Sequence, residues 1–472
     1  MILDWMTAAL TAFAAVEHEI MMFALVGLLI GGLDDFLMDM LFIGRAVWRR
    51  LTVYTRYPRM TAATLPPPER PGPLALFIPA WQESGVIGAM LRHCLRSWRA
   101  EDIMLFVGTY PNDPGTIRAV AAVAREDARI RLVVLPHDGG TTKADCLNHL
   151  WPALLREEER TGRRFKGVIL HDAEDVVHPD EIRLFDRMIE RFDMVQLPVR
   201  PLLSPRSRWI AGHYADEFAE AHGRTLVLRE AIGAAVPSAG VGCCFDRDRL
   251  ERIARDRGGM PFDPASLTED YEIGLHIREQ GGRTVFVTML DAKGSLICTQ
   301  EHFPETMEDA VKQKARWFVG IALAGWDRLG WHGSLRERWM RLHDRRAALA
   351  ALVILAAYLA IPAHAAVLLL RHIGLLPPPV PSPLVALGFQ VTLALMGWRL
   401  ASRAFWSARA YGWPQGLLAI PRTLVANYIM MRAMLHAMRR YVGQLKGGGI
   451  LWEKTRHIFP TLHPPEAHAA SL

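Results

Sequence analysis

The chain has 472 residues, of which 51% are hydrophobic and 22% are charged, a composition that excludes a disordered or fibrous protein. The faintly positive mean hydropathy of +0.10 favours a soluble body attached to a few membrane helices over a transporter made wholly of spans. The net charge of +6 comes from arginines that gather beside the apolar stretches. This placement favours a membrane surface and no nucleic-acid partner.

Residues 1–50 are expected to form an uncleaved N-terminal membrane anchor, because they lack a basic leader and carry Asp4 and Glu17. Their uncharged core, 20–33, is shorter than the ~20 residues that a bilayer requires. The span must therefore continue through three aspartates, Asp34, Asp35 and Asp39. Two placements stay open: these carboxylates face other membrane helices or arginines, or they lie at the headgroup boundary.

Residues 66–346 are expected to form a cytoplasmic α/β domain. Short apolar runs alternate with stretches of helical periodicity, which predicts a largely parallel sheet. The runs are 74–79, 104–108, 131–135 and 167–171. The five cysteines lack CxxC spacing, so we expect reduced thiols and neither disulfides nor a zinc site. Within this domain, residues 306–326 are predicted to be a helix at the membrane interface.

The C-terminal part is expected to hold two transmembrane helices in 347–404, then an interfacial helix and a cytoplasmic tail in 405–472. The stretch 414–440 is apolar but carries arginines. A helix at the interface is therefore favoured over a fourth span, because arginine is unfavourable in hydrocarbon. Three crossings with the arginine clusters inside place the large domain and the tail in the cytoplasm.

Three carboxylates follow the predicted strand 167–171, namely Asp172, Glu174 and Asp175. Ligands of open α/β sheets bind at the carboxyl edge of the strands, and clustered carboxylate oxygens suit Mg²⁺ or Mn²⁺ bridging to a diphosphate. The alternative is an acidic loop that the dipole of the next helix stabilises. That alternative explains Asp180 and Glu181 better than it explains Asp172.

A second acidic motif, 266–270, precedes a helical run. Ser266 and Glu269 have the spacing of a capping box, and this alternative accounts for Glu269 as well as a functional role does. Asp270 is less easily explained in this way. A carboxylate on a rigid helix start that accepts a proton from a sugar hydroxyl is what general-base catalysis requires.

A third motif, 313–317, lies in an apolar-rich helix. One interpretation is an amphipathic helix on the membrane surface whose basic residues reach the headgroups. The other gives Arg316 a forked contact with phosphate oxygens and lets Trp317 offer a flat apolar face to a sugar ring.

In this order and at these separations, the three motifs resemble the metal-binding, TED and QxxRW motifs of family 2 glycosyltransferases. The last is typical of membrane-embedded processive members such as cellulose and hyaluronan synthases. The segments 78–83 and 142–148 are similar to the family's nucleotide loop and lysine-containing donor loop. The resemblance covers residues 20–460. It leaves open whether Glu174 or Asp175 completes the metal site, since the family usually has Asp where this chain has Glu174.

The resemblance implies a GT-A fold, a Rossmann-like mixed sheet that binds a nucleotide sugar, embedded between transmembrane and interfacial helices. Asp270 would be the catalytic base with Glu269 beside it, and Mg²⁺ or Mn²⁺ would be the cofactor. Gln313 and Trp317 would bind the acceptor. The implied donor-binding residues are Glu83, Asp113, Lys143, Asp145 and Arg316.

The resemblance further implies an inverting, metal-dependent enzyme of the bacterial inner membrane. Its donor would be a UDP-sugar, with an N-acetylhexosamine suggested, and its acceptor a glycan or a lipid-linked sugar. The product would be a cell-surface or secreted polysaccharide. Because three crossings are few to enclose a polymer channel, a processive enzyme would need a homo-oligomer, close use of the interfacial helices or an outer-membrane export partner, and the sequence leaves these three open. Two alternatives are a non-processive, glycolipid-forming transferase and a non-catalytic membrane scaffold or receptor component.

Overall fold

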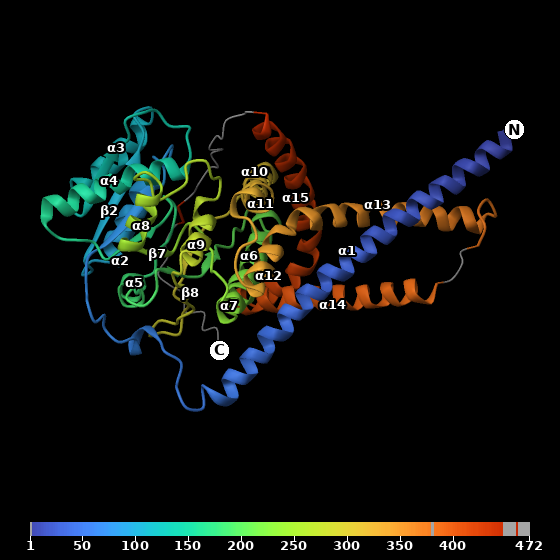
Figure 1. Ribbon diagram of the computed structural model, residues 1–472, viewed down its shortest axis with the longest axis horizontal. Helices are drawn as coiled ribbons and strands as arrows, with labels where there is room; N and C mark the ends of the chain where they lie inside the picture. The colour runs from blue at the N-terminus through green and yellow to red at the C-terminus, as the bar shows by residue number, and fades with distance from the viewer. Residues whose placement is uncertain (1, 379–381, 447–458, 461–472) are drawn as a thin grey trace.

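The computed structural model describes residues 2–378, 382–446 and 459–460. An α/β body lies at one end of the molecule, and three long helices project from the other (Figure 1). A layer of helices, among them α6, α10, α12 and α15, lies between the two parts (Figure 1). The site described below lies where this layer meets the body.

The body is built on a seven-stranded mixed sheet with the strand order β3-β2-β1-β4-β7-β5-β8. Strands β1 to β4 are parallel, and β7 runs antiparallel to both of its neighbours. The bounds are β1 Leu74–Pro79, β2 Ile103–Thr109, β3 Ile130–Val134, β4 Gly167–Leu170, β5 Met194–Gln196, β7 Cys243–Asp246 and β8 Thr284–Phe286. The four predicted runs are therefore all strands, and the predicted α/β sheet is confirmed.

Helices cover both faces of the sheet because side chains alternate along each strand. In β1, Leu74, Leu76 and Ile78 pack on one face, and Ala75 and Phe77 on the other. The first face is covered by α2 Ile87–Ser97, α3 Pro114–Ala124 and α5 Glu181–Met188, the second by α4 Lys143–Thr161, α8 Arg247–Asp256 and α9 Glu269–Glu279. All five cysteines are buried and free, as predicted.

The remaining elements lie mostly in the intervening layer, except that Ala62 of η1 packs against the core of the body. Strands β6 Val199–Pro201 and β9 Thr299–Glu301 pair in parallel as a small second sheet. The other elements are η1 Ala62–Thr64, α6 Ile210–Glu220, η2 Ala221–Thr225, α7 Leu226–Ala231, α10 Met307–Trp317, η3 Phe318–Leu323, α11 Ala324–Leu329, α12 Leu335–Arg345 and α15 Trp413–Leu445. The segment 306–326, predicted as one helix, is thus a continuous helical run from α10 to α11 that contains a π-helical turn, η3.

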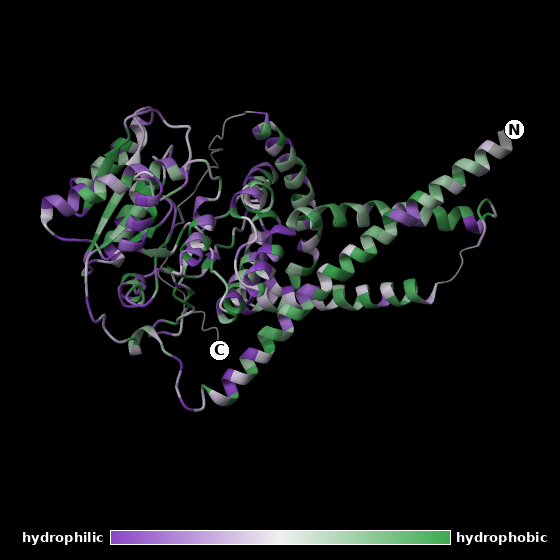
Figure 2. Ribbon diagram, viewed as in Figure 1, coloured by the Kyte–Doolittle hydropathy of each residue, from purple (hydrophilic) through white to green (hydrophobic). Residues whose placement is uncertain are grey.

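Within the part of the chain that the structure describes, three helices are long and apolar enough to cross a membrane, at the positions that the sequence predicted. They are α1 Ile2–Thr52, α13 Ala347–His372 and α14 Pro383–Tyr411. Hydrophobic residues predominate along the projecting parts of α13 and α14 (Figure 2). Helix α1 has 51 residues, far more than the ~20 needed for one crossing, and its C-terminal part runs past the intervening layer of helices (Figure 1).

Asp34, Asp35 and Asp39 of α1 are paired with arginines from other parts of the chain. Asp39 is 4% exposed and accepts a hydrogen bond from Arg224. Arg346 lies 2.7 Å from Asp34 and 2.5 Å from Asp35. Of the two placements left open by the sequence, the one facing arginines is therefore observed. These pairs connect α1 to the junction between α12 and α13 and to η2 in the intervening layer, since a carboxylate removed from water requires such a partner.

Helix α15 carries a buried arginine that is also neutralised by protein. Arg422 is 1% exposed, and its guanidinium lies 3.2 Å from Asp216 of α6 and donates to the carbonyl of Arg208. The helix contacts α6, α10 and α14 along its length. The helix is not among the three candidate spans of the described residues.

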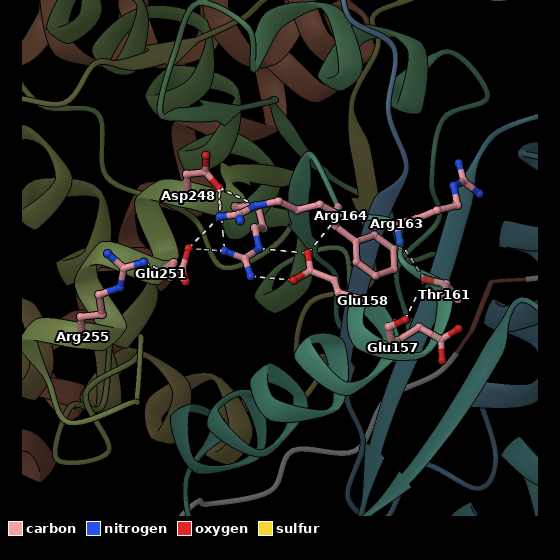
Figure 3. A network of polar contacts seen from close by, with 10 residues as sticks. Glu157, Glu158, Thr161, Arg163, Arg164, Asp248, Glu251 and Arg255 are labelled. Carbon is pink, nitrogen blue, oxygen red and sulfur yellow. Dashed lines mark hydrogen bonds and ion pairs between the residues drawn. The ribbon is translucent and has the colours of Figure 1, made fainter.

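A network of charged side chains joins the end of α4 to α8. Figure 3 shows Glu158, Arg164, Asp248 and Glu251 gathered between these helices. Arg247 donates to Glu158 and Glu251 and has a side chain that is 4% exposed. Its guanidinium also lies over the ring of Trp151, 5.3 Å from the ring centroid. The network holds α8 against the C-terminal half of α4.

We expect Arg247→Leu to lower the free energy of unfolding by about 2 kcal/mol, because hydrogen bonds between charged groups contribute about 1.5–3 kcal/mol. The matched control is Arg255→Ala, which removes a 70% exposed partner of the same Glu251 and should change stability by less than about 0.5 kcal/mol. Thermal unfolding of the detergent-solubilised chain measures both. Equal effects would show that the buried network does not stabilise the body.

Candidate active site

A cavity of about 130 Å³ opens where β1 and β4 end, between the sheet and α10. It brings together side chains from the loop after β1, the start of α4, the loop after β4, the start of α9 and helix α10. Nine of the predicted site residues line it, namely Glu83, Lys143, Asp172, Glu174, Glu269, Asp270, Gln313, Arg316 and Trp317. Three do not, namely Asp113, Asp145 and Asp175.

A buried triad of charged side chains fixes the position of the acidic motif after β4. His171, Asp175 and Glu181 are fully buried, and the two imidazole nitrogens lie 2.7 Å from Asp175 and 2.6 Å from Glu181. Burial lowers the pKa of His171, but the two carboxylates outweigh burial and raise it to about 10. Asp175 also accepts the amide proton of Asp172 at 3.0 Å. Of the two candidates to complete the metal site, only Glu174 therefore faces the cavity.

Lys143 places a positive charge between the two acidic motifs. It is the first residue of α4, and its Nζ lies 2.6 Å from Asp172 Oδ1 and donates to the carbonyl of Gly240 at 3.2 Å. Burial lowers the pKa of Lys143, but the carboxylates of Asp172, Asp270 and Glu269 raise it above its ordinary value. The ammonium is therefore fully charged at neutral pH.

Glu269 and Asp270 begin helix α9, and both point into the cavity. Burial raises the pKa of Asp270, and burial together with the charge of Asp270 raises the pKa of Glu269 to about 8. The Asp270 carboxylate lies against Gly240, which has φ +79°, and a Cβ at that glycine would overlap it. Sequence reasoning missed Gly240. The pair Gly240 and Gly242, two residues apart just before β7, was the available signal.

The capping-box interpretation of this motif is wrong. Ser266 donates to Glu272 at 2.6 Å and accepts the amide proton of Thr268 at 3.1 Å. Glu269 is therefore not engaged as a cap and lines the cavity.

Replacing Glu269 by Gln should flatten the pH dependence of stability. A carboxylic acid whose pKa rises on folding stabilises the folded state below its unfolded value of about 4.5, and this stabilisation is lost as pH rises through about 8. The melting temperature of the wild-type chain should therefore contain a component that falls between these two pH values. Glu269→Gln lacks this component, and identical pH profiles for the two chains would contradict the shift.

The half of the cavity beside α10 is aromatic and contains polar atoms that lack partners. Trp317 lies 6.1 Å from Tyr214 and 6.3 Å from Phe218, measured between ring centroids. Within the described residues, Gln313 Oε1 and Thr268 Oγ1 are buried and make no hydrogen bond. An apolar wall with open hydrogen-bonding atoms suits a sugar. Two aromatic lining residues, Phe218 and Phe303, were missed because they come from segments without a motif.

Two predicted donor-binding carboxylates are engaged elsewhere. Asp113 caps α3 by accepting from the amide of Thr116 at 3.2 Å, and it also accepts from the amide of Gln82 at 2.5 Å. Gln82 is in the left-handed region with φ +58°, so Asp113 stabilises the strained loop that carries Glu83. Asp145 accepts from the hydroxyl of Thr141 at 2.8 Å. Neither side chain lines the cavity, so direct contact with a donor in the cavity is not supported.

The cavity's acidic edge fits a divalent cation. Asp172 and Glu174 present carboxylate oxygens, the ligand type that Mg²⁺ and Mn²⁺ prefer. The side chain of Asp172 is 31% exposed, which leaves it accessible from the cavity. The ammonium of Lys143 beside it shows that this edge accommodates a positive charge.

Comparisons with known proteins agree with this geometry. Residues 71–320 match the model of a family described as glycosyltransferase like family 2. The chain is 36% identical over 487 residues to bacteriophage adsorption protein B of Escherichia coli K12 and, equally, to bacteriophage N4 adsorption protein B of E. coli O157:H7. The alignments cover 98% of this chain, which spans 64% of the length of these curated relatives.

In the sequence, two short segments, 109–113 and 452–455, suggest a resemblance to adsorption protein B, and the second lies outside the described residues. Among solved structures, the chain is similar to the mannosyltransferase PcManGT from Pyrobaculum calidifontis in complex with GDP-Man and Mn²⁺. The TM-score is 0.44 and the identity 16%, with 84% of this chain and 99% of that chain covered.

Proposed function

From the premise that the chain belongs to glycosyltransferase family 2, we propose that it is an inverting transferase that uses a UDP-linked sugar of the N-acetylhexosamine class. The acceptor is a glycan or a lipid-linked sugar. One observation carries this proposal: two separate acidic motifs face one cavity, with Asp172 and Glu174 at the end of β4 and Asp270 at the start of α9. Retaining and inverting enzymes both need to neutralise the charge on the departing diphosphate. An inverting enzyme acts by a single displacement, which also requires a separate base for the acceptor hydroxyl.

The donor half of the cavity is formed by the sheet edge. Glu83 and Lys143 bind the nucleotide end of the donor, and Arg316 from α10 contacts phosphate oxygens through its planar fork. Mg²⁺ or Mn²⁺, when bound by Asp172 and Glu174, supplies Lewis-acid neutralisation of the diphosphate. Lys143 adds a fixed positive charge at the same edge, where negative charge develops as UDP departs.

Asp270 accepts the proton of the acceptor hydroxyl. The acceptor oxygen then forms a bond to the anomeric carbon while the bond from that carbon to the diphosphate oxygen breaks and UDP leaves with the electron pair. Because attack comes from the face opposite the leaving group, the anomeric configuration inverts. Gly240 permits this role, since its missing side chain leaves room for the Asp270 carboxylate.

We place the protein in the bacterial inner membrane as a multi-pass protein with its catalytic body in the cytoplasm. Support comes from the three apolar helices and from the arginines next to them. The proposed product is a cell-surface or secreted polysaccharide, which leaves through a homo-oligomer or an outer-membrane export partner.

We expect Trp317→Ala to raise the KM for the acceptor by about tenfold while changing donor affinity little. A stacked ring contributes about 0.5–1.5 kcal/mol beyond the area it buries, which corresponds to roughly a tenfold change at most. Initial rates at varied acceptor concentration and donor binding by calorimetry separate the two. A matched loss of donor and acceptor affinity would contradict the stacking role.

The function is tested by incubating membranes that contain the full chain with labelled nucleotide sugars and Mg²⁺ or Mn²⁺, and then sizing the product. A long polymer from one UDP-sugar supports the proposal. A single added sugar on lipid would instead identify a non-processive glycolipid-forming enzyme. Absence of both transfer and donor hydrolysis with every sugar would favour the scaffold or receptor component and refute the proposal.

A further inference from the structure

A second cluster of metal-ligating side chains lies outside the cavity lining, where the loop between β3 and α4 meets α4. His137 belongs to the loop, and Asp145 and His149 lie one turn apart on the helix. One ligand atom from each residue lies within 4.8 Å of the others. The three side chains are 40%, 23% and 32% exposed, respectively, so an ion can reach them from solvent.

Among the described residues, no lysine or arginine forms an ion pair with the carboxylate of this cluster. Within the described residues, the ion-pair partners of Asp145 are the two imidazoles, at 3.5 Å from His137 and 3.6 Å from His149. A second group with similar spacing, Asp34, Asp35 and His343, differs in this respect. Its aspartates are paired with Arg346. Only the first cluster therefore keeps its negative charge for a cation.

Neighbouring groups orient all three ligands. His137 Nδ1 lies 3.2 Å from the carbonyl oxygen of Asp138, and His149 Nδ1 lies 2.9 Å from that of Asp145. In the tautomer of His137 that donates from Nδ1, its Nε2, which lies 3.5 Å from Asp145, carries a free lone pair. The nitrogen of His149 nearest the carboxylate is Nδ1, at 3.6 Å. The hydroxyl of Thr141 donates to Asp145 Oδ2. Such hydrogen bonds behind the ligands are the usual support of a metal site.

We propose that His137, Asp145 and His149 bind a Zn²⁺ ion, which thereby links the β3–α4 loop to helix α4. Two imidazole nitrogens and one carboxylate oxygen are a ligand set that suits Zn²⁺, and three protein ligands leave a position for water. The oxygen-only pair Asp172 and Glu174 favours Mg²⁺ or Mn²⁺ instead. Lys143 directly follows this loop in the sequence. The ion would therefore fix the start of α4 next to the active site.

The test is a Zn²⁺ titration of the full chain in detergent, after chelator treatment, against a chromophoric competitor and with excess Mg²⁺ present. We expect one Zn²⁺ per chain with a micromolar dissociation constant. His137→Ala and His149→Ala should each weaken binding at least about tenfold. The control is His276→Ala, which removes an imidazole of α9 that lies 3.7 Å from Glu279 and should leave binding unchanged.

Unchanged Zn²⁺ affinity in both cluster variants would overturn the proposal, as would binding only at millimolar concentration or binding that Asp172→Asn alone abolishes. The wild-type chain supplies a measurement that does not depend on variant folding. With Co²⁺ in place of Zn²⁺, the chain should show the visible absorption of a site with nitrogen ligands and low coordination number. Absence of that absorption would likewise overturn the proposal.

Discussion

Replacing Asp270 by Asn is expected to lower kcat by about 10²–10⁴-fold, the usual contribution of a positioned general base. Asn has the same size but cannot accept the proton of the acceptor hydroxyl. The carboxylate is confined between Gly240 and the charge of Lys143, so the amide should occupy the same place without repacking. Donor affinity should change little, because the proposed donor contacts come from Glu83, Lys143 and Arg316.

The measurement is single-turnover transfer with a saturating labelled donor, alongside donor binding by calorimetry. Asp102→Asn is the matched control, since it makes the same chemical change at a 56% exposed carboxylate outside the cavity. Full turnover by Asp270→Asn would remove Asp270 from the mechanism. Loss of donor binding together with turnover would instead assign it to the donor site.

Chelation of divalent cations is expected to stop transfer, with Mg²⁺ or Mn²⁺ restoring it, and Asp172→Asn should shift this restoration to much higher metal concentration. Loss of a residue that merely orients a metal ligand already weakens metal binding about 10–100-fold. Loss of one of two proposed carboxylate ligands should exceed the upper end of that range.

Asp172→Asn also removes the carboxylate that lies 2.6 Å from Lys143. A metal titration of transfer is therefore the decisive measurement, because loss of the Lys143 contact alone would lower the rate without changing the metal requirement. Asp180→Asn, at a carboxylate that is 36% exposed and outside the cavity lining, is the control. An identical metal dependence in wild type and Asp172→Asn would exclude Asp172 as a ligand.

Much of the active site could be predicted from sequence because its residues sit at the ends of regular elements. Asp172 and Glu174 directly follow a buried strand, and Asp270 begins a helix. In a parallel sheet these ends meet at one edge. The prediction could not separate Glu174 from Asp175, because only the buried partners His171 and Glu181 determine which carboxylate turns inward.

The sequence by itself determined strands β1 to β4, the three apolar helices and the order of the motifs, because hydrophobic periodicity and spacing are local properties. The short strands β5 to β9 were not predicted. Only the tertiary structure decided which partners meet across long separations. It paired the aspartates of α1 with Arg224 and Arg346, and it showed that Asp113 supports a loop and does not line the cavity. A side chain's role depends on which groups surround it after burial, and hydrogen bonds and charges between distant segments leave no periodic signal in the chain.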